Sequence, residues 1–337
     1  MSGPPFPSPF LERLAGLVPP DRFERTLRAL TEPKRVGFRV NRLRADRGEV
    51  EEALRQEGVE YTPVPWLPDA YTAGAECRSR LVRSPLFSTG RICLQNLSSM
   101  TAVHVLDPQP GEEVLDLAAA PGGKTLLLAQ RMQNRGRIAA VEAIRERLYK
   151  MQAVLKTGGA ANVKTYWTDG RTVGRKTPER FDRVLLDAPC SGESRFHAAD
   201  PASFARWSLR KISECARKQV GLLRSALAAA KVGGVVVYCT CSFAPEENEA
   251  VIDAALHDWE DAVALEPISL PVDNLQPGLA RWGEHAFHPA VISAVRILPT
   301  EEMDGFFLCR LRKTASLEEL SRHRGKGRRT RPRSRRR

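Results

Sequence analysis

The chain has 337 residues, 42% of them hydrophobic, and a formal net charge of +12; this length and composition predict a globular protein of about two domains. Its apolar runs are far shorter than the roughly 20 residues that cross a bilayer, and its first residues lack the charged and apolar regions of a secretory signal. Seven cysteines, an odd number spread along the chain, favour reduced thiols over a disulfide framework. We therefore expect a cytoplasmic protein with no membrane anchor.

Residues 1–90 mix two kinds of hydrophobic pattern. Apolar residues recur at helical spacing in three segments, and a short apolar run between them is typical of a strand. The helical segments are Phe10–Leu17, Phe23–Leu30 and Val50–Gly58, and the strand-like run is Val36–Val40. We predict a small α/β domain over residues 1–90.

Residues 91–313 alternate strand-like runs with helical segments, which predicts βαβ units and a mainly parallel sheet. The predicted strands are Val114–Ala119, Arg137–Val141, Val163–Trp167, Val184–Asp187 and Val235–Cys239, and the helices between them include Lys124–Met132, Ile144–Lys156 and Trp207–Ala230. Pro245 followed by Glu246 and Glu247 predicts a further helix start, because proline fits the first helical position and acids suit the positive dipole end. Late runs at Val291–Leu298 and Gly305–Leu311 predict a closing antiparallel hairpin.

The positive charge is concentrated at the C-terminus. Residues 321–337 contain ten Lys or Arg and no Asp or Glu, so the rest of the chain carries 42 basic against 40 acidic residues. Such a run cannot bury enough apolar surface to fold, and its natural partners are polyanions. We predict a basic disordered tail over residues 314–337 that contacts nucleic acid; a merely solvated tail is the alternative.

Acids and thiols follow the predicted strands of the second domain. In parallel sheets, ligands bind beyond the carboxyl ends of the strands. The residues placed there are Asp116, Glu142, Asp169, Asp187, Cys190 and Cys241. Each alone would suit a helix cap or a small core position, but together they predict one active site, and two thiols at one sheet edge indicate covalent chemistry.

The Gly-rich turn after the first of these strands predicts a cofactor site. A phosphate-binding loop is disfavoured, because Ala118 stands where that pattern needs its first glycine before Gly123-Lys124-Thr125, and the dinucleotide fingerprint is absent as well. A nucleoside without phosphates remains. Glu142 is placed to accept from ribose hydroxyls and Asp169 from an adenine amino group, which are the needs of S-adenosylmethionine. No metal site is predicted, since Cys239 and Cys241 lack a second ligand pair.

Three ordered segments resemble the signature motifs of the nucleolar-protein-2/Sun family of RNA cytosine-5 methyltransferases. They are Asp116-Leu-Ala-Ala-Ala-Pro-Gly-Gly-Lys-Thr125, Asp187-Ala-Pro-Cys-Ser-Gly192 and Thr240-Cys241-Ser242. The resemblance spans roughly residues 90–312. It implies a Rossmann-like α/β methyltransferase domain with a mainly parallel sheet, dependent on S-adenosylmethionine and preceded by a small RNA-binding domain.

The resemblance also implies a role for each site residue. The loop that would wrap the cofactor consists of Ala118, Ala119, Ala120, Pro121, Gly122, Gly123 and Lys124. Glu142 and Asp169 would hold the ribose and the adenine, and Asp187 would face the methionine end and the target base. Cys241 would be the nucleophile and Cys190 would assist product release. Independently of the resemblance, a thiolate nucleophile needs an electropositive setting, which Lys124 would help provide. The family often has Cys for Ala118, Asp for Glu142 and Ser for Cys239, substitutions that leave this chemistry intact.

We therefore predict an enzyme that forms 5-methylcytosine through a cysteine adduct at carbon 6 of cytosine, in ribosomal RNA first and transfer RNA second, and we assume a monomer. One alternative is a non-catalytic RNA-binding ribosome-assembly protein. Another is a DNA cytosine methyltransferase with Cys190 as nucleophile, against which the Thr240-Cys241-Ser242 motif argues. Four arginines fit either contacts with RNA phosphates or a solvated strand face: Arg35, Arg39, Arg42 and Arg44.

Overall fold

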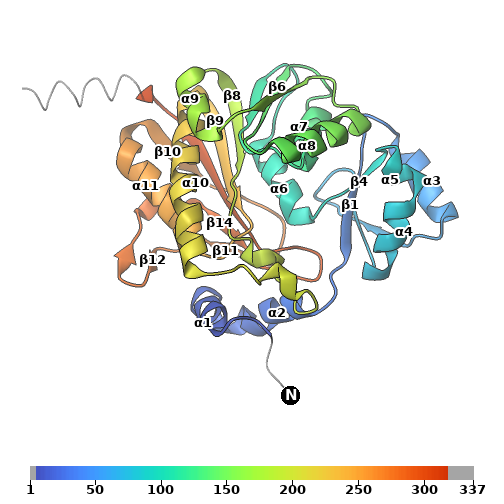
Figure 1. Ribbon diagram of the computed structural model, residues 1–337, viewed down its shortest axis with the longest axis horizontal. Helices are drawn as coiled ribbons and strands as arrows, with labels where there is room; N and C mark the ends of the chain where they lie inside the picture. The colour runs from blue at the N-terminus through green and yellow to red at the C-terminus, as the bar shows by residue number, and fades with distance from the viewer. Residues whose placement is uncertain (1–4, 318–337) are drawn as a thin grey trace, which may run out of the picture.

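The computed structural model of the protein describes residues 5–317, so residues 318–337 of the predicted tail lie outside the described part of the chain. A large sheet with helices on both faces forms the main body, and a smaller sheet lies beside it (Figure 1). The structure confirms the predicted α/β class with a mainly parallel central sheet. No helix of the described residues is long and apolar enough to cross a membrane.

The large sheet has nine strands in the order β11-β14-β15-β9-β8-β5-β6-β7, with β10 paired to β15. Its parallel strands are β5 (Glu113–Asp116), β6 (Arg137–Glu142), β7 (Val163–Trp167), β8 (Phe181–Asp187) and β9 (Ala230–Thr240), and its antiparallel strands are β10 (Val263–Glu266), β11 (Leu275–Pro277), β14 (Val295–Ile297) and β15 (Phe306–Lys313). All five predicted parallel strands are present, β7 with the predicted bounds. Their carboxyl ends therefore meet at one edge of the sheet.

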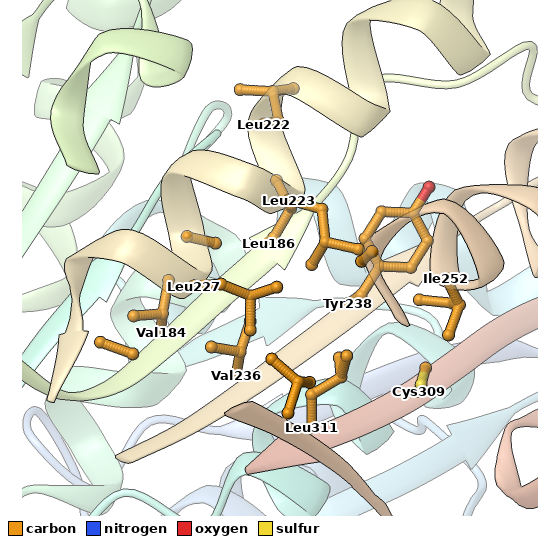
Figure 2. Close-up of a cluster of buried hydrophobic side chains, with 14 of the residues drawn as sticks. Val184, Leu186, Leu222, Leu223, Leu227, Val236, Tyr238, Ile252, Cys309 and Leu311 are labelled. Carbon is orange, nitrogen blue, oxygen red and sulfur yellow. The ribbon is translucent and has the colours of Figure 1, made fainter. Parts of the chain in front are cut away.

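Alternation along the strands builds a core on each face of this sheet. Val184 and Leu186 of β8 pack with one cluster, while Leu185 between them packs with another, as the two-residue period of a strand requires. The first cluster includes side chains of α10 and α11 (Figure 2), and the second includes side chains of α6 and α7. The helices of this body are α6 (Leu97–Leu106), α7 (Gly123–Arg131), α8 (Arg145–Gly158), α9 (Val173–Lys176), α10 (Leu209–Ala229) and α11 (Glu249–Trp259).

The N-terminal region divides between two packing partners. Residues 36–94 form an antiparallel sheet in the order β2-β3-β1-β4 with its own core. Its elements are β1 (Val36–Val40), α3 (Arg47–Gln56), β2 (Tyr61–Pro63), β3 (Ala70–Ala73), η1 (Ala75–Cys77), α4 (Arg78–Arg83), α5 (Pro85–Ser88) and β4 (Ile92–Leu94). The helices α1 (Ser8–Leu17) and α2 (Pro20–Thr31) lie apart from this sheet, below the large body in Figure 1. Phe10 of α1 packs on Phe196, with 4.9 Å between ring centroids.

Two predicted elements are wrong in part. Residues 245–247 form a 3-10 turn, η5, with Pro245 at its start, and α11 begins only at Glu249. The predicted strand Val291–Leu298 is shortened to β14, since a 3-10 turn with Pro289 at its first position occupies residues 289–293. The remaining short elements are η2 (Gly170–Thr172), η3 (Glu193–Arg195), η4 (Pro201–Ser203), η6 (Glu260–Ala262), β12 (Arg281–Trp282) and β13 (His285–Ala286).

Candidate active site

The two thiols that follow β8 and β9 lie in contact. Cys190 is three residues beyond β8, Cys241 is one residue beyond β9, and their sulfur atoms are 3.0 Å apart. Both cysteines are free. The hydrogen bond between the thiols raises the pKa of Cys190, and it lowers the pKa of Cys241 although burial opposes the shift. Cys241 is therefore the sulfur that more readily becomes a thiolate.

Asp187 lies beside this pair at the end of β8. Its Oδ2 accepts a hydrogen bond from Lys124 Nζ at 2.7 Å, and its Oδ1 accepts from Cys239 Sγ at 3.6 Å. Burial opposes the charge of Lys124, but Asp187 raises the pKa of the ammonium group. The side chain of Asp187 keeps 27% of its surface exposed, so a ligand can reach it.

The loop of residues 118–124 makes a tight turn into α7. Gly122 has a φ of +104°, and a Cβ on it would lie 3.1 Å from Met151 Cγ, so the turn requires glycine here. A Cβ on Gly123 would meet nothing closer than 3.9 Å, which leaves open space in front of the helix N-terminus. The Ala120–Pro121 bond within the loop is cis. This loop is shaped to let a ligand approach the backbone.

Three acids at neighbouring strand ends differ in burial. Glu142 at the end of β6 is 4% exposed, accepts from Ile144 N at 2.8 Å and pairs with Arg147 at 3.4 Å. Asp169, two residues beyond β7, is 41% exposed at its side chain and pairs with Arg171 at 2.6 Å. Asp116 at the end of β5 is buried behind the loop. Glu142 and Asp169 can thus offer acceptors of different accessibility to a nucleoside.

Asp116 is a buried carboxyl with an altered proton affinity. It is 1% exposed, and its Oδ2 accepts from Thr125 Oγ1 at 2.7 Å. Its other oxygen has no hydrogen-bond partner among the described residues. Burial raises the pKa of this carboxyl to about 7. A polar group that is buried and only half satisfied beside a ligand-sized loop is typical of a binding site.

Two parts of the chain match known families. Residues 103–312 match 16S rRNA methyltransferase RsmB/F, and residues 6–97 match the N-terminal domain of 16S rRNA methyltransferase RsmF. The chain belongs to the RsmB/F family. The resemblance drawn from the three motifs is thereby confirmed.

Individual relatives agree with this assignment. The chain is 38% identical over 308 residues to the human 28S rRNA (cytosine(4447)-C(5))-methyltransferase, across 90% of this chain and 37% of that protein. It is 35% identical over 325 residues to ribosomal RNA small subunit methyltransferase F of Escherichia coli O1:K1 / APEC, across 94% and 65%. A solved methyltransferase homolog protein from Pyrococcus horikoshii shares 34% identity and a TM-score of 0.78, over 92% of this chain and 96% of that one. The chain spans less than two thirds of the length of these two curated relatives.

In this RsmB/F-family chain, a buried carboxylate joins the two thiol loops. Glu247 is fully buried, and its Oε2 accepts from Ser191 N and Gln219 Nε2, each at 2.9 Å. Its Oε1 accepts from Ser242 Oγ at 2.8 Å. Ser191 follows Cys190 and Ser242 follows Cys241, so one side chain fixes both loops. Sequence reasoning placed Glu247 only in the first turn of a helix and did not predict these contacts.

A second buried carboxylate reaches the same hydroxyl group. Glu193 Oε2 accepts from Ser242 Oγ at 3.1 Å and from Phe243 N at 2.9 Å, and its Oε1 accepts from Trp207 Nε1 at 2.8 Å. Burial raises the pKa of both Glu193 and Glu247. Since one hydroxyl has one proton to donate, the two carboxylates compete for Ser242. The sequence carries no periodic signal for such a contact.

Two arginines near the site were also missed. The negative charge of a Cys241 thiolate raises the pKa of Arg195 on η3, and the charge of Arg195 in turn lowers the pKa of Cys241 more than that of Lys124 does. Arg147 donates to Ala120 O at 2.8 Å as well as pairing with Glu142, so it connects the loop to that acid. Both lie within six residues of a predicted site residue, which is the one signal the sequence offers.

Arg39 does not fit either prediction made for the four arginines. It is 1% exposed, so it is neither a phosphate contact nor part of a solvated face. Its guanidinium donates to Gln95 Oε1 at 3.0 Å, to Gln130 Oε1 at 2.5 Å and to Gly123 O at 3.3 Å. Burial lowers its pKa. Arg39 therefore ties the small sheet to both ends of α7.

Proposed function

We propose that this RsmB/F-family chain transfers a methyl group from S-adenosylmethionine to carbon 5 of cytosine in ribosomal RNA. The observation that carries the proposal is the sulfur pair of Cys190 and Cys241, 3.0 Å apart at the carboxyl edge of the sheet and beside Asp187. The family match and the curated names of the relatives support ribosomal RNA as the substrate.

Cys241 would supply the nucleophile. Its thiolate adds to carbon 6 of cytosine, and the carbon–sulfur bond turns the ring into an enamine that is nucleophilic at carbon 5. The lowered pKa of Cys241, which results from its hydrogen bond with Cys190, supports this role. Asp187 would hydrogen-bond the edge of the base, since its carboxylate is partly exposed next to the thiols.

Cys190 would act after methyl transfer. A base removes the proton from carbon 5, the ring electrons return, and the carbon–sulfur bond breaks to leave Cys241 as a thiolate. The thiol of Cys190, 3.0 Å from that sulfur, would donate a hydrogen bond to the thiolate and so stabilise the leaving group. The raised pKa of Cys190 keeps its proton available for this hydrogen bond.

The residues of the predicted cofactor site fit a nucleoside with a positive sulfonium. When bound, S-adenosylmethionine supplies an electrophilic methyl group. The loop of residues 118–124 leaves space before Gly123, Glu142 offers a buried acceptor for the ribose, and Asp169 offers a more exposed acceptor for the adenine. Asp187 would face the methionine end. Lys124, paired with Asp187, would hold that carboxylate in place.

Bisulfite sequencing of total RNA from a strain that lacks this gene tests the proposal. One or more ribosomal cytosines should lose protection from conversion, and the wild-type gene should restore it while the Cys241→Ala gene should not. If only cytosines of transfer RNA lose protection, the substrate is transfer RNA and not ribosomal RNA. No change at any cytosine would favour the ribosome-assembly alternative.

A further inference from the structure

Exposed hydrophobic side chains are concentrated in one part of the chain. Ten large hydrophobic side chains of the described residues are exposed, and five of them come from residues 144–167, which contain α8 and β7. These five are Ile144, Tyr149, Val154, Tyr166 and Trp167. Trp167 has the largest exposed fraction of the ten, 60%, and Tyr149 has 53%. Concentration of this kind marks a binding surface more often than scattered exposure does.

The exposed aromatic rings are held in fixed positions around one arginine. Trp167 Nε1 donates to Ala143 O at 3.0 Å, which fixes the indole. The guanidinium of Arg145 lies 5.3 Å from the Trp167 ring centroid and 5.6 Å from that of Tyr149, and its Nε donates to Tyr149 Oη at 2.8 Å. We call Arg145, Tyr149 and Trp167 the Trp167 patch. The two aromatic rings of the patch are therefore held in position without a bound partner.

The charge of the Trp167 patch is positive. Helix α8 carries four basic residues and one acid. No acid of the described residues forms an ion pair with Arg145, whereas Arg147 two positions on pairs with Glu142. A partner with negative charge would therefore find the Arg145 guanidinium available.

The Trp167 patch lies at the carboxyl edge of the large sheet, the edge that also carries the thiols. Trp167 ends β7, the outermost strand, and is in register with Glu142. Four strand steps separate β7 from β9, and at about 4.8 Å per step this places Trp167 roughly 19 Å from the thiols. A chain whose target base occupies the thiol site can thus extend to the patch across the same edge.

We propose that the Trp167 patch binds unpaired RNA nucleotides that flank the target cytosine. Bases stack on exposed tryptophan and tyrosine rings, and an arginine between the rings contacts phosphate or stacks on a base. The combination of exposed aromatic rings with an arginine that has no ion-pair partner in the described part of the chain favours RNA over an apolar protein as the ligand, because an apolar protein surface would need no cation. The inference rests on the proposed function, because it takes RNA as the substrate.

Fluorescence anisotropy of a labelled, cytidine-rich single-stranded RNA oligonucleotide tests the patch. Trp167→Ala should weaken binding about fivefold or more with an unchanged salt slope, and Trp167→Phe should restore much of the affinity. Arg145→Gln should lower the slope of log affinity against log salt by about 0.7. Val232→Ala is the matched control, since Val232 is 50% exposed near the amino end of β9, at the opposite edge of the sheet.

Calorimetry with S-adenosylmethionine completes the test. Both patch variants should bind the cofactor as the wild-type protein does. If the patch variants bind S-adenosylmethionine more weakly but bind RNA with unchanged affinity, the proposal is overturned. Trp167 would then line the binding site of the adenine. Unchanged affinity for both ligands, or a change in oligomeric state on light scattering, would overturn it as well. Because these assays need no turnover, a wild-type protein that binds RNA through the patch but transfers no methyl group would contradict only the proposed function.

Discussion

Two halves of one sheet edge are built differently. At β8 and β9, the loops that carry the thiols are fixed by Glu247 and Glu193, which are fully buried and 2% exposed. At the end of β7, on the other side of the sheet, Asp169 and Trp167 remain 41% and 60% exposed. In the proposed reaction, the covalent step needs sulfur atoms held in position, whereas the cofactor and the RNA strand must enter and leave in each turnover. The difference in burial follows these different demands.

The largest effects are expected from removing each thiol. Cys241→Ala should reduce methyl transfer by roughly 10³-fold or more, because no carbon–sulfur bond can form. Cys190→Ala should form that bond and release it slowly, since the leaving sulfur loses its hydrogen-bond donor. Denaturing electrophoresis after incubation with RNA and S-adenosylmethionine should show a covalent RNA–protein species for Cys190→Ala and none for Cys241→Ala.

Cys93→Ala is the control for these variants, because Cys93 is a half-buried thiol in β4 that belongs to the small sheet. It should retain activity. An adduct from Cys241→Ala but none from Cys190→Ala would reverse the two roles and favour the DNA-type assignment.

The next effect concerns the carboxylate that joins the thiol loops. In Glu247→Gln an amide NH2 would replace one acceptor oxygen and face the donors of Ser191, Gln219 or Ser242. Such mispairing of a buried group costs about 1–3 kcal/mol, so kcat should fall roughly 10- to 100-fold while cofactor affinity stays unchanged. The pH profile of Cys241 alkylation should shift as well.

Glu246→Gln is the matched control, because Glu246 is partly exposed and pairs with Arg13. It should leave kcat near the wild-type value. Wild-type kcat in Glu247→Gln, with an unmoved alkylation profile, would show that the buried contacts serve folding only.

The cofactor half of the edge predicts a graded response. Glu142→Ala removes a buried acceptor and leaves a ligand donor unpaired, which costs about 1–3 kcal/mol of binding free energy. The loss of S-adenosylmethionine affinity should lie at the upper end of that range. Asp169→Ala removes a partly exposed acceptor that already pairs with Arg171, and its effect should be smaller. Isothermal calorimetry measures both. Equal wild-type affinity in the two variants would remove these acids from the cofactor site.

Of these substitutions, one at Asp116 should have the smallest effect on catalysis. A measurable effect on the free energy of unfolding is expected at Asp116. Its pKa of about 7 exceeds the value of about 3.9 in an unfolded chain. The folded state therefore keeps a proton that the unfolded state has lost, and the free energy of unfolding should fall as pH rises from about 4 to 7. Asp116→Asn cannot ionise and should remove this part of the slope. Urea denaturation at several pH values measures it, and parallel profiles for the two proteins would contradict the raised pKa.

Local patterns predicted the parallel strands and the edge where the thiols meet. The run Val163–Trp167 became β7 with the same bounds, and Cys190 met Cys241 because parallel strands bring their carboxyl ends together. What the patterns lacked was tertiary hydrogen bonding. Glu247 is read as a helix acid from its neighbours along the chain, yet two of its partners, Gln219 and Ser191, lie 28 and 56 positions away. Arg39 was misplaced for the same reason, since three polar partners compensate its burial.

The first two helices carry a consequence for how this protein can be divided. Phe10 of α1 covers Phe196 and Phe243, while Arg13 donates to Glu246 at 2.6 Å, next to the carboxylate of the thiol loops. A recombinant fragment that begins after the small sheet would expose these rings to water and lose that contact. We therefore expect the body that carries the large sheet to depend on these two helices for stability. Gene fusions and truncations that aim to transplant its chemistry should retain residues 8–31.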